Sequence, residues 1–130
     1  MPDFVLRTRK KQEMVDITRQ VADLVRQTGI ADGMCLVYTP HATAALVINE
    51  NADPNVCEDT LDAMSRMVPE GAWRHDRVDN NAAAHIKATI LGPSETVPVH
   101  SGMLRLGTWQ RLMLVELDGP RDRTVIVEVR

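Results

Sequence analysis

Four histidines are the residues of this chain best suited to chemistry: His41, His75, His85 and His100. A neutral imidazole can bind a metal ion, and its proton can be transferred near neutral pH. Three imidazoles that met at one point would hold Zn²⁺ and leave a fourth position for water or substrate. The spacing by itself is a weak signal, because 34 residues separate His41 from His75 and the chain has no H-E-x-x-H motif.

The neighbourhoods of three histidines strengthen this interpretation. His41 lies between two apolar runs, residues 34–38 and 42–48, and functional side chains often lie at such strand ends. Asn81 and His85 are four residues apart, so on a helix they share one face. His75 precedes that helix in a loop that is rich in ionisable groups, and the loop can bring it over His85.

Other polar side chains are candidates for supporting roles. Asn49 and Glu50 follow the apolar run 42–48, and Glu50 is suited to orient an imidazole or to act as a general base. The alternative for this segment is a capped turn that leads into the next helix. Lys87 and Arg121 are candidates for holding an anion, and the alternative is that both are surface charges.

The pattern of apolar residues predicts the elements that position these side chains. Apolar alternation and short apolar runs indicate about seven strands, within residues 3–9, 13–17, 34–38, 42–48, 97–106, 110–117 and 125–129. Helical spacing indicates three helices, which begin near residues 18, 54 and 80. The helices do not alternate regularly with the strands, so we expect a single α+β domain over residues 1–130 with mainly antiparallel sheet.

Side chains at the expected helix starts indicate how each helix is capped. Thr18 is placed to cap the first helix, and Asp53 followed by Pro54 is a typical start of the second. Asp79 or Asn80 is expected to cap the third helix.

Composition excludes several classes of partner. The chain has 130 residues and a formal charge of −3, and aromatic residues make up 3% of it, so neither a basic surface nor a ladder of stacking rings is expected for nucleic acid. No apolar run approaches the roughly 18 residues needed to cross a membrane. The N-terminal residues lack the pattern of a secretory signal, and Cys35 and Cys57 suit free thiols in a reducing compartment, so we expect a cytoplasmic protein.

Five sequence blocks together resemble one family. They are HATAAL (41–46), INE followed by DP (48–50 and 53–54), NAAAHIK (81–87), GxLxLGTWQ (102–110) and ExDGxR (116–121). In this order, and over nearly the whole chain, the blocks resemble the YjbQ family, whose members are described as secondary thiamine-phosphate synthases.

The resemblance implies a two-sheet β-sandwich that assembles as a homotrimer and binds a metal through histidines. His41, His75 and His85 match the recurrent histidines of the family, whereas His100 falls outside the pattern and is left out of the site. Ala83 stands where many relatives carry Asp, which puts full activity in doubt if that acid assists the chemistry.

The reaction implied by the resemblance joins hydroxymethylpyrimidine diphosphate to thiazole phosphate and releases pyrophosphate. In this reading Zn²⁺ sits on His41, His75 and His85, Mg²⁺ can accompany the pyrophosphate, and Lys87 or Arg121 holds phosphate oxygens. Glu50 orients a ligand or accepts a proton. The partner is a small phosphorylated metabolite. The alternatives are a non-enzymatic trimeric protein that binds a metal or a phosphorylated metabolite, and hydrolysis by a metal-bound water.

Overall fold

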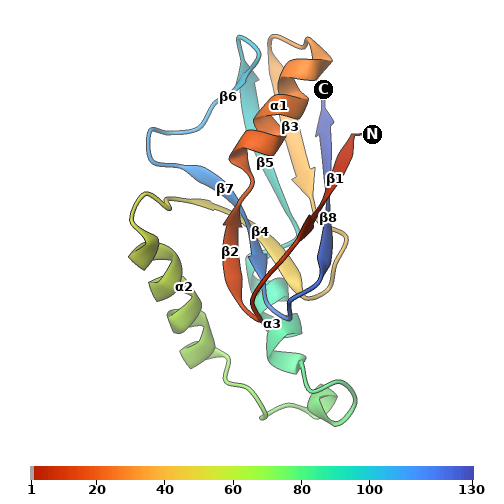
Figure 1. Ribbon diagram of the computed structural model, residues 1–130, viewed down its shortest axis with the longest axis vertical. Coiled ribbons are helices and arrows are strands. Elements are labelled where there is room, and N and C mark those ends of the chain that lie inside the picture. Colours follow the sequence, from red (N-terminus) through yellow and green to blue (C-terminus); the bar gives the residue numbers. More distant parts are fainter. Residues whose placement is uncertain (1) are drawn as a thin grey trace.

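A computed structural model of the protein describes residues 2–130 and shows two antiparallel β-sheets with helices packed around them (Figure 1). The strands are β1 (Asp3–Arg7), β2 (Glu13–Asp16), β3 (Gly33–Tyr38), β4 (Ala44–Asn49), β5 (Ser94–His100), β6 (Met103–Leu104), β7 (Arg111–Glu116) and β8 (Asp122–Val129). The helices are α1 (Thr18–Thr28), α2 (Pro54–Met67) and α3 (Ala82–Leu91), with a short 3₁₀ turn η1 (Arg74–Arg77) before α3.

The two sheets confirm the predicted α+β architecture. The larger sheet has the order β1-β8-β3-β5-β6 and the smaller has the order β2-β7-β4. The described residues contain one strand more than expected, because the segment 97–106 is a hairpin of β5 and β6 rather than one strand. Ser101 and Gly102 form its turn with φ of 52° and 77°, and such positive values are typical of a tight hairpin turn.

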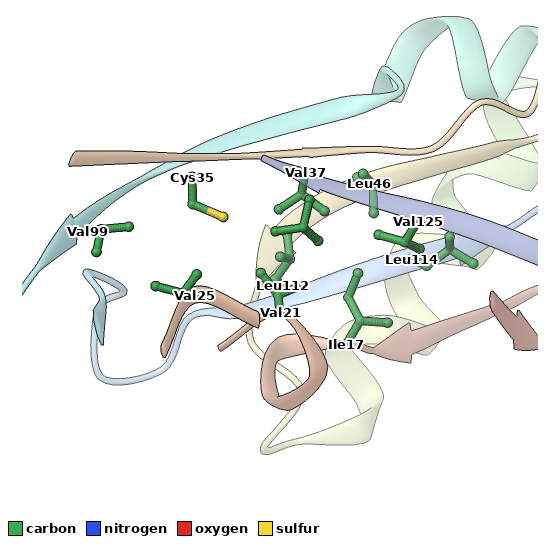
Figure 2. Close-up of a cluster of buried hydrophobic side chains, with 11 residues drawn as sticks. Ile17, Val21, Val25, Cys35, Val37, Leu46, Val99, Leu112, Leu114 and Val125 are labelled. Atoms are coloured by element: carbon green, nitrogen blue, oxygen red, sulfur yellow. The ribbon is translucent and has the colours of Figure 1, made fainter. Parts of the chain in front are cut away.

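The main core lies between α1 and the inner faces of both sheets (Figure 2). The inner face of β8 presents Val125 and Val127, and both are fully buried, as the alternation of residues 125–129 predicts. Ile17, Val21 and Val25 come from the start and the inner face of α1 and are fully buried as well. Full burial of each such side chain contributes about 1.5–3 kcal/mol, so this cluster holds the two sheets together.

A second apolar cluster covers the opposite face of the smaller sheet. Its buried members are Ala45, Ala84, Ala88, Val115 and Leu117. Because this second cluster buries the opposite face of the smaller sheet, the run 42–48 is apolar on both faces. β4 is an edge strand of its sheet, but it is covered on both faces, because it packs against α3 on one side and the main core on the other.

The helix starts differ in part from the predicted caps. The Asp53 carboxylate accepts the amide of Asn55 at 2.9 Å, which confirms the cap of α2. Thr18 is instead the first residue of α1, and its hydroxyl accepts the Leu112 amide at 2.8 Å. The prediction of Asp79 or Asn80 as the cap of α3 is wrong, because the Asp76 carboxylate accepts the Ala82 amide at 3.0 Å.

No helix within residues 2–130 is both long enough and apolar enough to cross a bilayer.

Candidate functional site

A solvent-open pocket of about 400 Å³ lies where the loop after β3, the start of β4 and helix α3 meet. Two of its lining residues are polar rings, His41 from the loop and His85 from α3. The rest of the lining is small or weakly polar: Ala42, Ala44, Ala88, Thr89 and Pro93. The fold thus brings together two histidines that are 44 positions apart in the chain.

The ring of His41 is held by a backbone hydrogen bond. Its Nε2 accepts the amide of Thr124 at 2.9 Å, so in the neutral ring the proton resides on Nδ1. Burial is the largest cause that lowers the pKa of His41, and the positive charges of Arg123 and Arg121 lower it further, while Glu116 opposes them. His41 is therefore a neutral ring with Nδ1–H as its available donor.

His75 and His85 form a pair at the entrance to α3. Their ring centroids are 4.9 Å apart and the rings are nearly perpendicular, at 87°. The Nε2 atom of His75 lies 3.7 Å from an oxygen of Asp79, and its side chain is 41% exposed. The loop therefore brings His75 to His85, as we predicted.

The arrangement does not fit the predicted three-histidine zinc site. Among residues 2–130 no group of three or more His, Cys, Asp and Glu side chains is placed to hold a metal ion. A metal on Nδ1 of His41 would also require the ring proton on Nε2, where it would face the amide hydrogen of Thr124. The prediction that His41, His75 and His85 coordinate one metal ion is therefore wrong for the chain as it folds.

A buried ion pair holds Thr43, two residues after His41, and adjoins Thr124, whose amide donates to the His41 ring. Arg123 donates through Nε to the carboxylate of Glu116 at 2.9 Å, and a second contact runs between its Nη2 and the other carboxylate oxygen. The guanidinium also donates to the hydroxyl of Thr43 at 2.9 Å and to its carbonyl at 3.1 Å. Thr43 and Thr124 are the neighbours that set the position of the His41 ring.

The same carboxylate orders the turn that carries Arg121. Glu116 accepts the amide of Asp118 at 3.0 Å, and Asp118 accepts from the side chains of Asn81 at 2.8 Å and Arg121 at 3.2 Å. Gly119 is required here, because a Cβ at this position would meet the side chain of Glu116 and the carbonyl of Lys10. Asn81 and Arg121 are therefore linked through Asp118 to the buried carboxylate of Glu116.

Three predicted site residues lie away from the pocket. Asn49 and Glu50 are at the far end of β4, and five residue steps of about 3.4 Å place that end roughly 17 Å from Ala44. Lys87 is 1% exposed, and its Nζ donates to the Ser65 hydroxyl of α2 at 3.0 Å. Lys87 therefore faces α2, and Glu50 has no imidazole beside it in the pocket.

Sequence reasoning missed Arg123, Thr43 and Thr124 as parts of the site. The one local signal was Glu116, an acid in an otherwise apolar strand, which predicts a buried partner. The chain has 15 Lys and Arg side chains, so the identity of that partner required the fold. His100, which was left out of the site, lies on β5 and contacts Asp32 at 2.7 Å.

Comparison with known proteins gives consistent matches over the whole chain. A family model described as UPF0047 protein YjbQ-like matches residues 3–130. A UPF0047 protein of Archaeoglobus fulgidus is 53% identical over 127 residues, which are 97% of this chain and 98% of the relative. The UPF0047 protein YugU of Bacillus subtilis is 43% identical over 127 residues, which are 95% and 94% of the two chains.

Solved structures show the same fold. The crystal structure of an uncharacterized conserved protein of the YjbQ/UPF0047 family from Clostridium acetobutylicum superposes with a TM-score of 0.96 at 41% identity and covers 100% of both chains. A YbjQ-like protein of unknown function from Sulfolobus solfataricus gives a TM-score of 0.95 at 42% identity, covering 98% of this chain and 94% of the other.

These findings correct the activity that the resemblance implied. The relatives described above are named as UPF0047, uncharacterized or unknown-function proteins, and none of these names assigns a thiamine-phosphate synthase or another transferase. The residues that would have held the zinc ion do not form a metal site in the described part of the chain. The predicted zinc-dependent transferase is therefore wrong.

Proposed function

The chain belongs to the UPF0047 (YjbQ-like) family, and we propose that its pocket between His41 and His85 binds a small metabolite that carries a phosphate group. The observation that carries the proposal is the placement of the His41 ring. Its Nε2 accepts the Thr124 amide, which leaves Nδ1–H as a donor in a solvent-open pocket that is also lined by His85.

The donors of the pocket suit phosphate oxygens. The Nδ1–H of His41 is free to donate because its Nε2 is already occupied by Thr124. His85 adds a second ring from the opposite wall. A phosphate accepts such hydrogen bonds more strongly than a neutral group does, because bonds to charged partners are about twice as strong.

The size and lining of the pocket limit the rest of the ligand. A volume of about 400 Å³ lies in the range typical of small-molecule sites, about 300–1,000 Å³. The lining offers methyl groups from Ala42, Ala44 and Ala88 and the ring of Pro93. These groups suit a short apolar or sugar-like part rather than a long charged one.

The proposal includes assembly as a homotrimer. The family resemblance is the reason for three copies, and an exposed apolar face supplies a surface for association. On the outer face of the larger sheet Met34 is 59% exposed and Leu36 and Tyr38 are each 40% exposed. Contiguous apolar surface of this kind usually marks a site of association.

We place this binding function in the cytoplasm. Cys35 and Cys57 are not joined in a disulfide, and Cys35 is fully buried in the main core. Free thiols of this kind are typical of a reducing compartment.

Nuclear magnetic resonance of the histidine side chains tests the binding proposal. Glycerol 3-phosphate and inorganic phosphate are titrated into the trimeric or monomeric protein as purified, with and without Mg²⁺, because a divalent cation often accompanies bound phosphate. We expect the signals of His41 and His85 to shift, and we expect His100 to stay unchanged as the internal control on β5.

Two variants sharpen this test. His85→Ala is expected to weaken binding at least about tenfold if it loses one charge-assisted hydrogen bond. His41→Gln can place its side-chain carbonyl near the position of Nε2, where it accepts the Thr124 amide, and it removes the Nδ1–H, so this variant tests that donor separately from the fold. Equal signal changes at all four histidines, or none up to millimolar ligand, would refute the proposal.

A further inference from the structure

A second cavity, of about 420 Å³, lies on the loop between α2 and α3. It is lined by Gly71, Ala72, Trp73, Arg74, Asp76 and Arg77, and it shares no lining residue with the His41–His85 pocket. We infer that this cavity is a second ligand site, for an anion that carries a planar ring, such as a nucleoside phosphate.

The ring of Trp73 is fixed while part of it stays open to solvent. Its Nε1–H donates to the Pro69 carbonyl at 2.7 Å, and its backbone amide donates to the Asp76 carboxylate at 3.1 Å. The residue is nevertheless 39% exposed. A tryptophan that is already held loses little freedom on binding, so its indole face is available for stacking with a flat ring.

Two arginines, Arg74 and Arg77, line the same cavity as this ring. Arg74 and Arg77 are three residues apart in η1, and side chains at this spacing in a 3₁₀ turn project on the same side. Neither forms a salt bridge with any residue in the range 2–130. Their planar forks match phosphate oxygens in geometry and charge.

The acids near the cavity are occupied by other contacts. Asp76 uses one oxygen for the Ala82 amide at 3.0 Å and the other for the Trp73 amide at 3.1 Å. Asp79 lies 3.7 Å from the His75 ring and is not among the lining residues. Within the lining the two arginines exceed the one acid, Asp76, by one positive charge, although the whole chain carries −3.

Ring and charge together select the ligand class. A cavity of about 420 Å³ has room for more than a phosphate ion. Stacking of a base on an aromatic side chain contributes about 1–3 kcal/mol, so one fixed indole beside two guanidinium groups favours a phosphorylated planar ring over a bare anion.

The fluorescence of Trp73 provides a direct test with adenosine diphosphate as the probe. Trp109→Phe removes the only other tryptophan, which is 67% exposed, and leaves Trp73 as the single reporter. We expect adenosine diphosphate to quench this fluorescence and calorimetry to give the same affinity. Absence of quenching and of heat up to millimolar nucleotide would overturn the inference.

Charge-removing variants test the role of the arginines. Arg74→Gln and Arg77→Gln are each expected to weaken nucleotide binding roughly tenfold, since each loses a charge-assisted contact. Arg19→Gln is the matched control, because it removes one exposed arginine from α1. Equal weakening by all three variants would show attraction by net charge alone and would overturn the site.

Two further comparisons separate this site from simpler explanations. Trp73→Phe keeps an aromatic ring and is expected to retain nucleotide binding, measured by calorimetry, whereas Trp73→Leu is expected to weaken it. Pyrophosphate that binds as tightly as adenosine diphosphate would overturn the role of the ring. In the histidine NMR spectrum, adenosine diphosphate is expected to shift the signal of His75, which lies in η1 between two lining residues of the cavity. A shift of His41 without a change at His75 would place the nucleotide in the first pocket and overturn a separate site.

Discussion

Glu116 and Arg123 form an ion pair whose side chains are 0% and 2% exposed. The pair joins β7 to β8 and holds the two backbone segments that position His41. Removal of one partner leaves the other charge buried without compensation, and such changes typically cost about 3–5 kcal/mol.

We therefore expect Arg123→Met to lower the free energy of unfolding by about 3–5 kcal/mol in chemical denaturation. The matched control is Asp122→Asn, which removes an exposed pair with Arg7 at 3.6 Å, with side chains 70% and 63% exposed. Its effect is expected to stay within about 1 kcal/mol. Similar losses for the two variants would contradict a special role for the buried pair.

The pH dependence of stability provides a second test of this pair. Burial acts to raise the pKa of Glu116, but hydrogen bonds from Arg123, Thr8 and the Asp118 amide outweigh it, and the net pKa lies below the usual 4.5. A carboxyl group whose pKa is lower in the folded than in the unfolded protein stabilises the fold at pH values above its unfolded pKa. This contribution is lost as the pH falls through the folded pKa.

We expect the difference in unfolding free energy between wild type and Glu116→Gln to be constant near neutral pH and to shrink below about pH 4.5. Urea denaturation between pH 7 and pH 3 measures both curves. A difference that is independent of pH would show that the carboxylate is not the source of the stability.

His41 is expected to be neutral at pH 7 with its proton on Nδ1. Its ring is partly buried and near Arg123, so its pKa lies below the usual 6.5. Nitrogen-15 chemical shifts distinguish the two ring nitrogens, and Nε2 should give the unprotonated shift down to pH values below 6.5. A protonated Nε2 at pH 7 would contradict the hydrogen bond from Thr124.

Lys87 and Ser65 supply a prediction that is independent of the pocket. Burial lowers the pKa of Lys87, and the Ser65 hydroxyl is the acceptor of its Nζ. Ser65→Ala should cost about 1–3 kcal/mol, because the buried ammonium loses its acceptor. In the Lys87→Met background the same substitution should be nearly neutral. Equal costs in both backgrounds, measured by denaturation, would show that the two groups do not interact.

The proposed assembly depends on the outer face of the larger sheet. Leu36→Glu places a charge at the centre of this face, and we expect it to shift the mass in sedimentation equilibrium from a trimer toward 14.5 kDa. Val78→Glu is the control, because Val78 is 75% exposed but lies after η1, outside this sheet. A wild-type protein that remains at 14.5 kDa would contradict the trimer.

Local patterns in the sequence predicted the elements that depend on near neighbours. Asp53 followed by Pro54 identified the start of α2, because capping involves residues only two positions apart. The alternation of residues 125–129 identified the inner face of β8, because side chains on a strand repeat every two residues. Ser101 and Gly102 carried a turn signal for the β5–β6 hairpin that the alternation obscured.

The candidate site could be predicted only in part. The pairing of His75 with His85 follows from their proximity along the chain and from the short turn η1 between Trp73 and α3. The meeting of His41 with His85 was implied by the family resemblance, because the spacing of the two residues along the chain is by itself a weak signal. The sequence did not show whether these histidines can act as metal ligands. The tautomer of an imidazole depends on what its second ring nitrogen contacts, and that contact is known only from the fold.

The sequence by itself determined the α+β class, the helices, most strands and the family, since these depend on periodicity and on blocks read in order. The tertiary structure alone decided that Thr124 occupies Nε2 of His41 across 83 residues, and that Arg123 is the partner of Glu116. It also decided that Lys87 turns to α2 instead of the pocket. The periodicity of apolar residues predicts which face of a helix or strand is buried. The residues that contact that face depend on how distant segments of the chain pack together.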